Sequence, residues 1–218
     1  MHLDITTIII IITALISIGG FSNQKIIDDL IFYPPAVSKH NQWYRFFTCG
    51  LIHADVGHLI FNMLSLYLFG KEVEKIFVGI FNENGKWLYL VMYVTALFVC
   101  LLPTYFRNRS NYYYRSLGAS GAVSAVVFAG LTLLPGMEVS LFFIPVFIPG
   151  FIFGPLYLLI SAWLDRKGGG NINHSAHFWG ALYGVLFIII AGRIVGFDAI
   201  ENFKLGVQSY LQAKGWSH

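Results

Sequence analysis

The stretch GASGAVSAVVFAGLTLL, residues 118–134, decides the fold of this chain. It carries no charge, and small residues recur in it at four-residue spacing, namely Gly121, Ala125 and Ala129. A second stripe of the same kind lies within residues 174–194, namely Ala176, Gly180 and Gly184. Small residues on one helix face let membrane helices approach closely, because no side-chain bulk holds the backbones apart. We therefore expect two helices that pack directly against each other.

The whole chain is too apolar for a domain whose surface faces water. Of its 218 residues, 56% are hydrophobic and 11% are charged, and the mean hydropathy is +0.66. Soluble domains carry roughly a quarter charged residues, and long apolar blocks are typical of membrane spans. The net charge of +3 comes from scattered residues without a dense basic cluster, so no nucleic-acid partner is indicated. Cys49 and Cys100 lack metal-type spacing, so neither a zinc site nor a disulfide framework is supported.

Six apolar blocks are predicted to be transmembrane helices, at residues 3–21, 57–75, 87–105, 118–134, 139–164 and 174–194. Backbone groups in hydrocarbon must be satisfied within their own segment, and the alternation of a membrane barrel is absent, so the fold class is all-α. One six-helix membrane domain then accounts for residues 1–218, with a mildly amphipathic tail at 195–218. The prolines of the fifth block, at positions 145, 149 and 155, predict that it is kinked or partly distorted. No Lys or Arg precedes the first block, which we interpret as a retained span and not as a signal peptide.

The charges of the connections do not decide the orientation of the chain. With six spans, the side that holds the termini carries six Lys and Arg residues, and the other side carries eight. The positive-inside rule needs a clear excess on one side, and this count leans slightly against cytoplasmic termini.

Four polar residues lie within the predicted spans and need an explanation. His58 and Asn62 belong to the second span, Ser120 to the fourth and His177 to the sixth. Polar and ionisable residues inside a membrane are costly and mark functional sites by default. These three spans run in the same direction, and all four residues fall in the first turns of their spans. We therefore expect them near one membrane face and at similar depth.

This set of residues matches the needs of acyl transfer. A serine hydroxyl becomes a nucleophile when a base within hydrogen-bond reach takes its proton, and His177 is the candidate base for Ser120. The oxygen that becomes negative needs hydrogen-bond donors already in place, which His58, the Asn62 amide and the Ser120 backbone N–H can supply. No acid lies in the sixth span to orient the histidine, and Asp55 is better read as a solvated loop carboxylate. The sequence therefore predicts a dyad.

Two other interpretations compete with the dyad. A serine in a membrane helix often bonds only to a carbonyl of its own helix, so Ser120 alone would carry little weight. A metal site built from His53, His58 and His177 is the sharper alternative, because neutral imidazole is a common ligand. No carboxylate or thiolate accompanies these histidines, so we do not expect a metal site there. An α/β-hydrolase elbow would need strands and a second glycine, and the sequence offers neither.

Taken together, the motifs resemble the rhomboid family of intramembrane serine proteases, over essentially the whole six-span core. Its Gly-x-Ser-Gly motif corresponds to Gly118, Ser120 and Gly121, and its Ala-His-x-x-Gly-x-x-x-Gly motif to Ala176, His177, Gly180 and Gly184. Its His-x-x-x-Asn motif corresponds to His58 and Asn62, with His53 five residues earlier. Trp43 and Arg45 match Trp-x-Arg in the first connection, and Gly70 and Glu74 match Gly-x-x-x-Glu.

The resemblance implies a rhomboid-like bundle with a Ser120–His177 dyad and an oxyanion hole formed by His58, Asn62 and the Ser120 amide. It implies single-span transmembrane proteins as substrates, the lipid bilayer as surroundings, and no metal or cofactor. It also implies a bacterial plasma membrane with cytoplasmic termini and a site that opens outward.

Several bacterial members place a tyrosine four residues after the serine, where it stacks on the histidine, whereas this chain has Ser124. Trp179, Tyr183 or Ser124 itself is then expected to orient His177. The alternative functions are an inactive rhomboid-like protein that binds membrane clients and a small transporter. Inactive relatives usually lack the serine or the histidine, and a transporter is expected to show charges within spans or internal symmetry.

Overall fold

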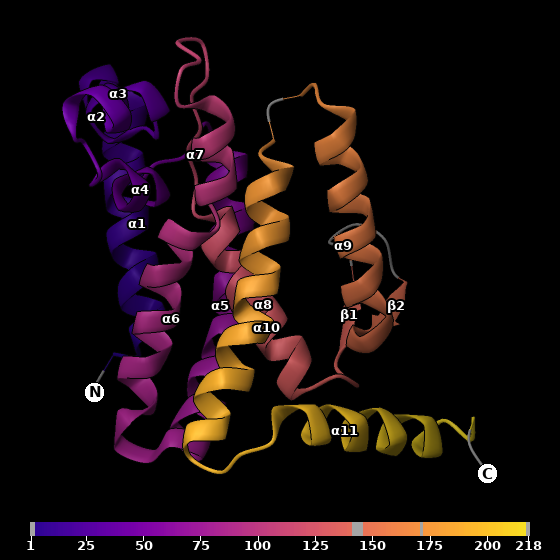
Figure 1. Cartoon of the computed structure of the whole chain (residues 1–218). Coiled ribbons are helices and arrows are strands. Elements are labelled where there is room, and N and C mark those ends of the chain that lie inside the picture. The colour runs from indigo at the N-terminus through magenta and orange to yellow at the C-terminus, as the bar shows by residue number, and fades with distance from the viewer. Residues whose placement is uncertain (1–2, 141–145, 171, 217–218) are drawn as a thin grey trace.

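The computed structural model describes residues 3–140, 146–170 and 172–216, and it is mostly helical. Long helices run side by side, and one further helix lies across an end of the bundle (Figure 1). The long helices are α1 (Ile5–Ser22), α5 (Val56–Phe81), α6 (Gly85–Val99), α8 (Ser120–Leu133), α9 (Gly150–Lys167) and α10 (His174–Ile194). The helix across the end is α11 (Ala199–Ala213), and a short α7 (Leu102–Asn108) follows α6.

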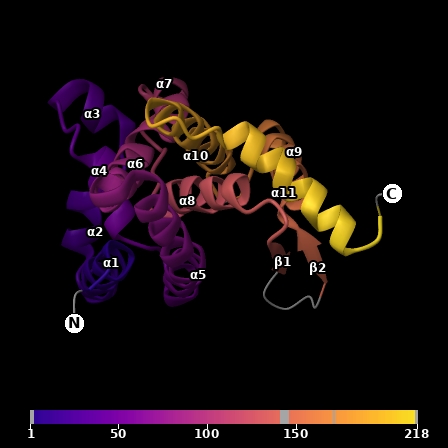
Figure 2. The ribbon, with the colours of Figure 1, turned by 90° about the horizontal axis from the view of Figure 1, so that it is seen from below.

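The helix α8 lies in the middle of the bundle, between α5 and α6 on one side and α9 on the other (Figure 2). Nearly all of its side chains are buried, and it packs most extensively against α10. A Cβ atom added at Gly180 would overlap the carbonyl oxygen of Gly121, and one added at Gly184 would overlap that of Ala125. The predicted contact between the two small-residue stripes is therefore confirmed, and it brings backbone against backbone.

A buried carboxylate fixes the beginning of α1 against α5. Glu74 is 3% exposed, and it accepts hydrogen bonds from the backbone N–H groups of Ile5 and Thr6 at 2.8 and 2.9 Å. The Thr6 hydroxyl donates to the same carboxylate at 2.8 Å. The first N–H groups of a helix have no partner inside it and favour negative charge, so Glu74 satisfies them. An added Cβ at Gly70 would lie 2.8 Å from the Thr6 side chain, so this glycine makes room for the contact.

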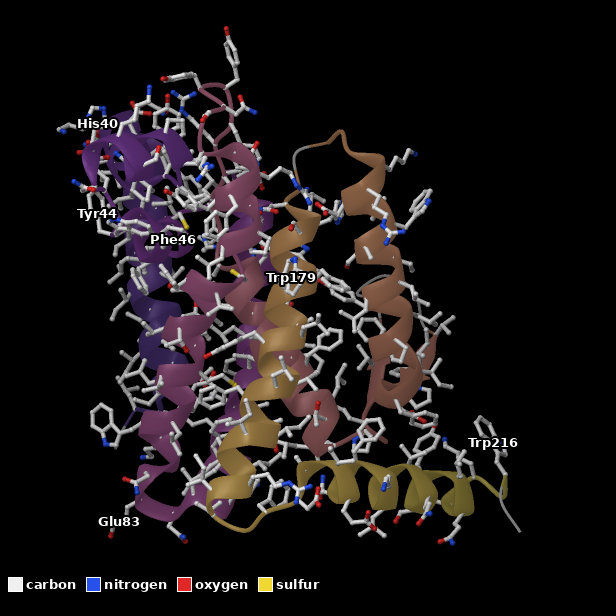
Figure 3. The ribbon with its side chains drawn as sticks, viewed as in Figure 1. His40, Tyr44, Phe46, Glu83, Trp179 and Trp216 are labelled. Carbon is white, nitrogen blue, oxygen red and sulfur yellow. The ribbon has the colours of Figure 1, made fainter. Side chains whose placement is uncertain are left out.

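The first connection is an ordered set of short helices held together by Arg45. It comprises α2 (Gln24–Leu30), α3 (Pro34–His40), α4 (Arg45–Thr48) and the 3-10 turn η1 (Cys49–Leu51). The Arg45 guanidinium is buried and donates to the carbonyls of Asp28 and Ile31, both at 2.8 Å. Trp43 stacks on Phe46, whose ring points inward while Tyr44 lies outside (Figure 3). Trp43 and Arg45 therefore stabilise this connection.

The fifth predicted block is not one continuous helix. It begins with the strand β1 (Glu138–Ser140), which pairs antiparallel with β2 (Phe147–Pro149), and the helix α9 starts only at Gly150. Proline disfavours the helical conformation in the residue before it and lacks an N–H to continue a helix, which explains a helix start after Pro149. The part of the block at residues 141–145 lies outside the described residues.

The C-terminal tail forms a regular helix that is docked onto the bundle. The Asn202 amide donates to the Leu133 carbonyl at the end of α8, at 2.9 Å. The Glu138 carboxylate of β1 accepts from the Tyr210 hydroxyl and pairs with Lys214, both at 2.9 Å. These contacts place α11 across one end of the bundle (Figure 1).

Three helical segments of the described chain are long and apolar enough to cross a membrane. They are Ile5–Ser22, Val56–Asn108 (which contains α5, α6 and α7) and His174–Ile194. The helix α8 is apolar but has only 14 residues. At 1.5 Å per residue it is about 21 Å long, less than the roughly 30 Å of a hydrocarbon core. The count of six spans goes beyond this criterion and stays a prediction.

Candidate active site

The structure brings Ser120 and His177 into direct contact. The Ser120 Oγ lies 2.6 Å from the His177 Nε2, across the interface of α8 and α10. Ser120 is the first residue of α8, and His177 lies in the first turn of α10. Both side chains are partly buried. The close packing at Gly180, one turn beyond the histidine, sets this short distance.

The start of α10 is fixed by an asparagine that the sequence analysis did not single out. The Asn173 Oδ1 accepts from the backbone N–H of Ala176 at 3.0 Å and from the Thr104 hydroxyl at 3.1 Å. Asn173 thereby caps α10 and ties it to α7. Asparagine three residues before a helical Ala176 is a normal N-cap pattern, so the signal was present in the sequence.

Gly118 lies under the ring of His58. Its φ angle is +109°, a conformation that residues with a side chain rarely adopt. An added Cβ would lie 2.7 Å from His58 Cε1 and 3.0 Å from His58 Nε2. The Gly118 N–H donates to the Cys49 carbonyl at 2.9 Å. Both the positive φ of the turn and the nearby imidazole therefore require glycine at position 118. His58 thus lies against the residue that is two positions before Ser120 in the sequence.

Asn62 lies one turn further along α5 than His58. Its side chain is 2% exposed, and its amide Nδ2 donates to the His58 carbonyl at 2.9 Å. A primary amide has two hydrogens, so one remains for another acceptor. Asp55 caps α5 by accepting from the His58 N–H at 2.8 Å. It therefore acts on the helix start, and its side chain makes no hydrogen bond to His177 among the described contacts.

His53 is buried beneath the segment that leads to Ser120. Its Nε2 accepts from the Ala119 N–H at 3.4 Å, and its Nδ1 lies 2.9 Å from the Ser17 Oγ. Burial lowers the pKa of His53 to about 4, so the ring is neutral at ordinary pH. Its ring lies steeply inclined against that of His58, with centroids 5.0 Å apart and an angle of 76° between the planes.

Two of the three histidines of the metal alternative have hydrogen-bond partners of their own. Both nitrogens of His53 face Ser17 and Ala119, and the Nε2 of His177 faces Ser120. Among the described residues, no group of three or more His, Cys, Asp or Glu side chains is arranged to hold a metal ion.

The residues expected to orient His177 have partners elsewhere. The Tyr183 hydroxyl lies 2.6 Å from the Thr95 Oγ1 of α6, and the Ser124 Oγ lies 3.3 Å from the Tyr157 hydroxyl of α9. Trp179 on α10 is 43% exposed, and its ring contacts Phe178 (Figure 3). Apart from Ser120, the described ring contact of His177 is the edge of His174, with centroids 6.0 Å apart.

Two apolar cavities lie away from this site. One, of about 280 Å³, is bounded by α8, α9, α10 and α11 and includes Phe128, Gly154 and Phe203. The other, of about 320 Å³, lies where α5, α6 and the end of α10 meet and includes Trp87. Neither lining contains a residue of the Ser120 site.

Comparison with known proteins places this arrangement in a family. The family model described as the Rhomboid domain matches residues 40–194. "RHOMBOID-like protein 12, mitochondrial" of Arabidopsis thaliana is 30% identical, with 66% of this chain and 45% of the relative covered. "Putative rhomboid protease YdcA" of Bacillus subtilis is 29% identical, with 67% of this chain and 66% of the relative covered. "Presenilin-associated rhomboid-like protein, mitochondrial" of Bos taurus is 28% identical, with 66% and 37% covered.

The chain belongs to the rhomboid family. Its apolar helices and this membership identify it as an integral membrane protein. The matches span between 37% and 66% of the lengths of the three relatives.

Proposed function

We propose that this protein is an intramembrane serine endopeptidase that cleaves the transmembrane helices of single-span membrane proteins. The observation that carries the proposal is the 2.6 Å contact between Ser120 and His177, two residues from different helices in a rhomboid-family chain. A hydroxyl and an imidazole at this distance have the geometry of a nucleophile and its general base.

The chemistry needs only groups of this chain, the substrate and water. The Ser120 Oγ attacks the scissile carbonyl carbon while its proton passes to the Nε2 of His177. When the tetrahedral intermediate collapses, the C–N bond breaks and His177 gives the proton to the leaving amine. Water activated by the same histidine then hydrolyses the ester on Ser120 and restores the free hydroxyl.

The developing negative oxygen has donors on two helices. The Ser120 N–H belongs to the first turn of α8, where backbone donors are free and the helix dipole favours negative charge. The ring of His58, which lies over Gly118, and the second amide hydrogen of Asn62 are the proposed donors from α5. Donors that are already fixed stabilise the transition state without reorganisation. We propose a dyad and not a triad, because the described side-chain partners of His177 are Ser120 and His174, neither of which is an acid.

The six proposed spans are α1, α5, α6 with α7, α8, α9 and α10, within one domain of residues 1–218.

The short length of α8 suggests where cleavage takes place. If the end of α8 that contacts α11 lies at the membrane surface, a helix of about 21 Å leaves Ser120 about 9 Å below the opposite face of the hydrocarbon. Following the family resemblance, we place the termini in the cytoplasm of a bacterium and the site toward the outer face.

The test is cleavage of a model single-span substrate by the purified full chain in liposomes. We expect turnover by the wild type and a loss of about 10³-fold or more in Ser120→Ala and His177→Ala, since nucleophile and base act as a unit. Ser209→Ala on α11 and His40→Ala on α3 are matched controls, because both side chains are exposed and remote from the site.

Cleavage that survives in Ser120→Ala would overturn the mechanism. A wild-type protein that cuts no substrate but retains membrane clients on purification would instead support the client-binding alternative.

A further inference from the structure

The hydroxyl of Ser17 is buried between α1 and the segment of η1 and His53 that precedes α5. Its side chain is 0% exposed, and its Oγ lies 2.9 Å from both the Leu51 carbonyl and the Nδ1 of His53. The helix α1 otherwise presents mostly large apolar side chains to the surroundings, since only 22% of its span is buried. Ser17 is therefore a polar contact between a peripheral helix and the catalytic region.

The number of protons in this cluster fixes the direction of each hydrogen bond. A carbonyl can only accept, so the single hydroxyl proton of Ser17 points at Leu51. The Ser17 oxygen then accepts from His53, which places the ring proton on Nδ1. The Nε2 of a neutral ring is left as an acceptor, and the Ala119 N–H lies 3.4 Å from it. A continuous series of three hydrogen bonds thus runs from the Ala119 N–H through His53 and Ser17 to the Leu51 carbonyl.

This series of hydrogen bonds begins next to the proposed nucleophile. Ala119 is the N-cap of α8 and directly precedes Ser120. The ring of His53 also meets the ring of His58, which in turn covers Gly118. A shift of His53 therefore moves the backbone that presents the serine and, through a ring contact, a proposed oxyanion donor.

We propose that Ser17 is a positioning residue, which fixes the tautomer and ring position of His53 and thereby holds the Gly118–Ala119 turn that presents Ser120. The inference rests on the proposed protease function for its effect on rate. The hydrogen-bond chain itself can be observed without any activity.

Thr13 provides a matched control on the same helix. It lies one turn before Ser17 and is 0% exposed, and its hydroxyl has no hydrogen-bond partner within the described part of the chain. Thr13→Val and Ser17→Ala each remove one buried hydroxyl from α1, but only Ser17→Ala breaks the contact with His53. Ser17→Thr keeps the hydroxyl and is the conservative variant.

The kinetic experiment measures kcat and KM of the purified variants on a model single-span substrate. We expect Ser17→Ala to lower kcat about tenfold with little change in KM, the effect of one hydrogen bond felt at the reacting group. Thr13→Val should keep the wild-type kcat, and Ser17→Thr should recover most of it. Equal losses in Ser17→Ala and Thr13→Val would reduce Ser17 to a packing residue and overturn the proposal.

Nuclear magnetic resonance of the ¹⁵N-labelled protein separates this proposal from the proposed function. We expect His53 in the Nδ1–H tautomer in the wild type, and faster hydrogen exchange at the Ala119 amide in Ser17→Ala than in Thr13→Val. An Nε2–H tautomer in the wild type would overturn the proposal, because that nitrogen could not accept from Ala119. A protein with these signals but without cleavage would contradict the protease function and leave the hydrogen-bond chain intact.

Discussion

The helix α8 has α10 on one side and α9 on another, and the two neighbours pack against it differently. Against α10, the backbones touch, and neither Gly180 nor Gly184 leaves room for a methyl group. Against α9, the contacts run through side chains. An added Cβ at Gly154 would lie at an ordinary 3.6 Å from Phe128, and an apolar cavity of about 280 Å³ remains beside it.

The difference explains why the proposed dyad lies on one interface and not on the other. A misplacement of 1 Å can cost about 10²-fold in rate, so the two reacting side chains need helices that cannot shift relative to each other. Direct packing of backbone against backbone holds α8 and α10 in a fixed relative position. The interface with α9 is packed through side chains, and neither Ser120 nor His177 belongs to α9.

The largest expected effect comes from adding one methyl group to the tight interface. Gly180→Ala should destabilise the protein by about 3 kcal/mol and remove most activity, because its Cβ would overlap the Gly121 carbonyl and push the two helices apart. Gly154→Ala is the matched control on the other interface and should change both quantities little. Thermal unfolding in detergent and initial cleavage rates measure the two effects. Similar outcomes for the two variants would remove the distinction between the interfaces.

At α5, another neighbour of α8, the expected effect is on turnover, with a smaller effect on stability. Asn62→Ala should lower kcat by a smaller factor than Ser120→Ala, since one oxyanion donor contributes roughly 3 kcal/mol to the barrier. The measurement is steady-state turnover, with thermal unfolding recorded alongside. A loss as large as that in Ser120→Ala, together with a lower unfolding temperature, would assign Asn62 a structural role through its bond to the His58 carbonyl.

The smallest effect is expected at the loose interface itself. Tyr157→Phe removes a hydroxyl that lies 3.3 Å from the Ser124 Oγ, one turn after Ser120. We expect a loss of about 0.5–1 kcal/mol in stability and no decrease in turnover. Unfolding curves and cleavage rates of the same preparations check this. A decrease in turnover comparable to that of Gly180→Ala would show that α9 holds the dyad as firmly as α10 does.

Much of the site could be predicted because its cause is local. Small residues every fourth position define a helix face, and parallel spans place their first turns at one membrane face. Together these two facts predict that Ser120 and His177 lie close to each other. Other parts had no local signal. The hydrogen bond between Ser17 and His53 joins residues that are 36 positions apart, and no pattern in the sequence around either residue predicts the contact.

The fifth block departs from one continuous helix, for a physical reason. Hydropathy measures how well a segment tolerates lipid, and it reads residues 139–164 as one apolar run. Hydrogen bonding decides its conformation, and the helix begins only after Pro149, behind two paired strands. Of the three residues expected to orient His177, Tyr183 bonds to Thr95 and Ser124 to Tyr157.

The sequence by itself determined the apolar segments, the stripes that join α8 to α10, and the candidate nucleophile and base. These follow from composition and helical spacing, which are properties of single segments. Only the tertiary structure decided which buried polar groups satisfy one another: Glu74 at the start of α1, Asn173 at the start of α10, and Ser17 beneath His53. Such pairs depend on where whole helices come to rest, because a buried hydrogen bond requires its two partners to meet within about 3 Å.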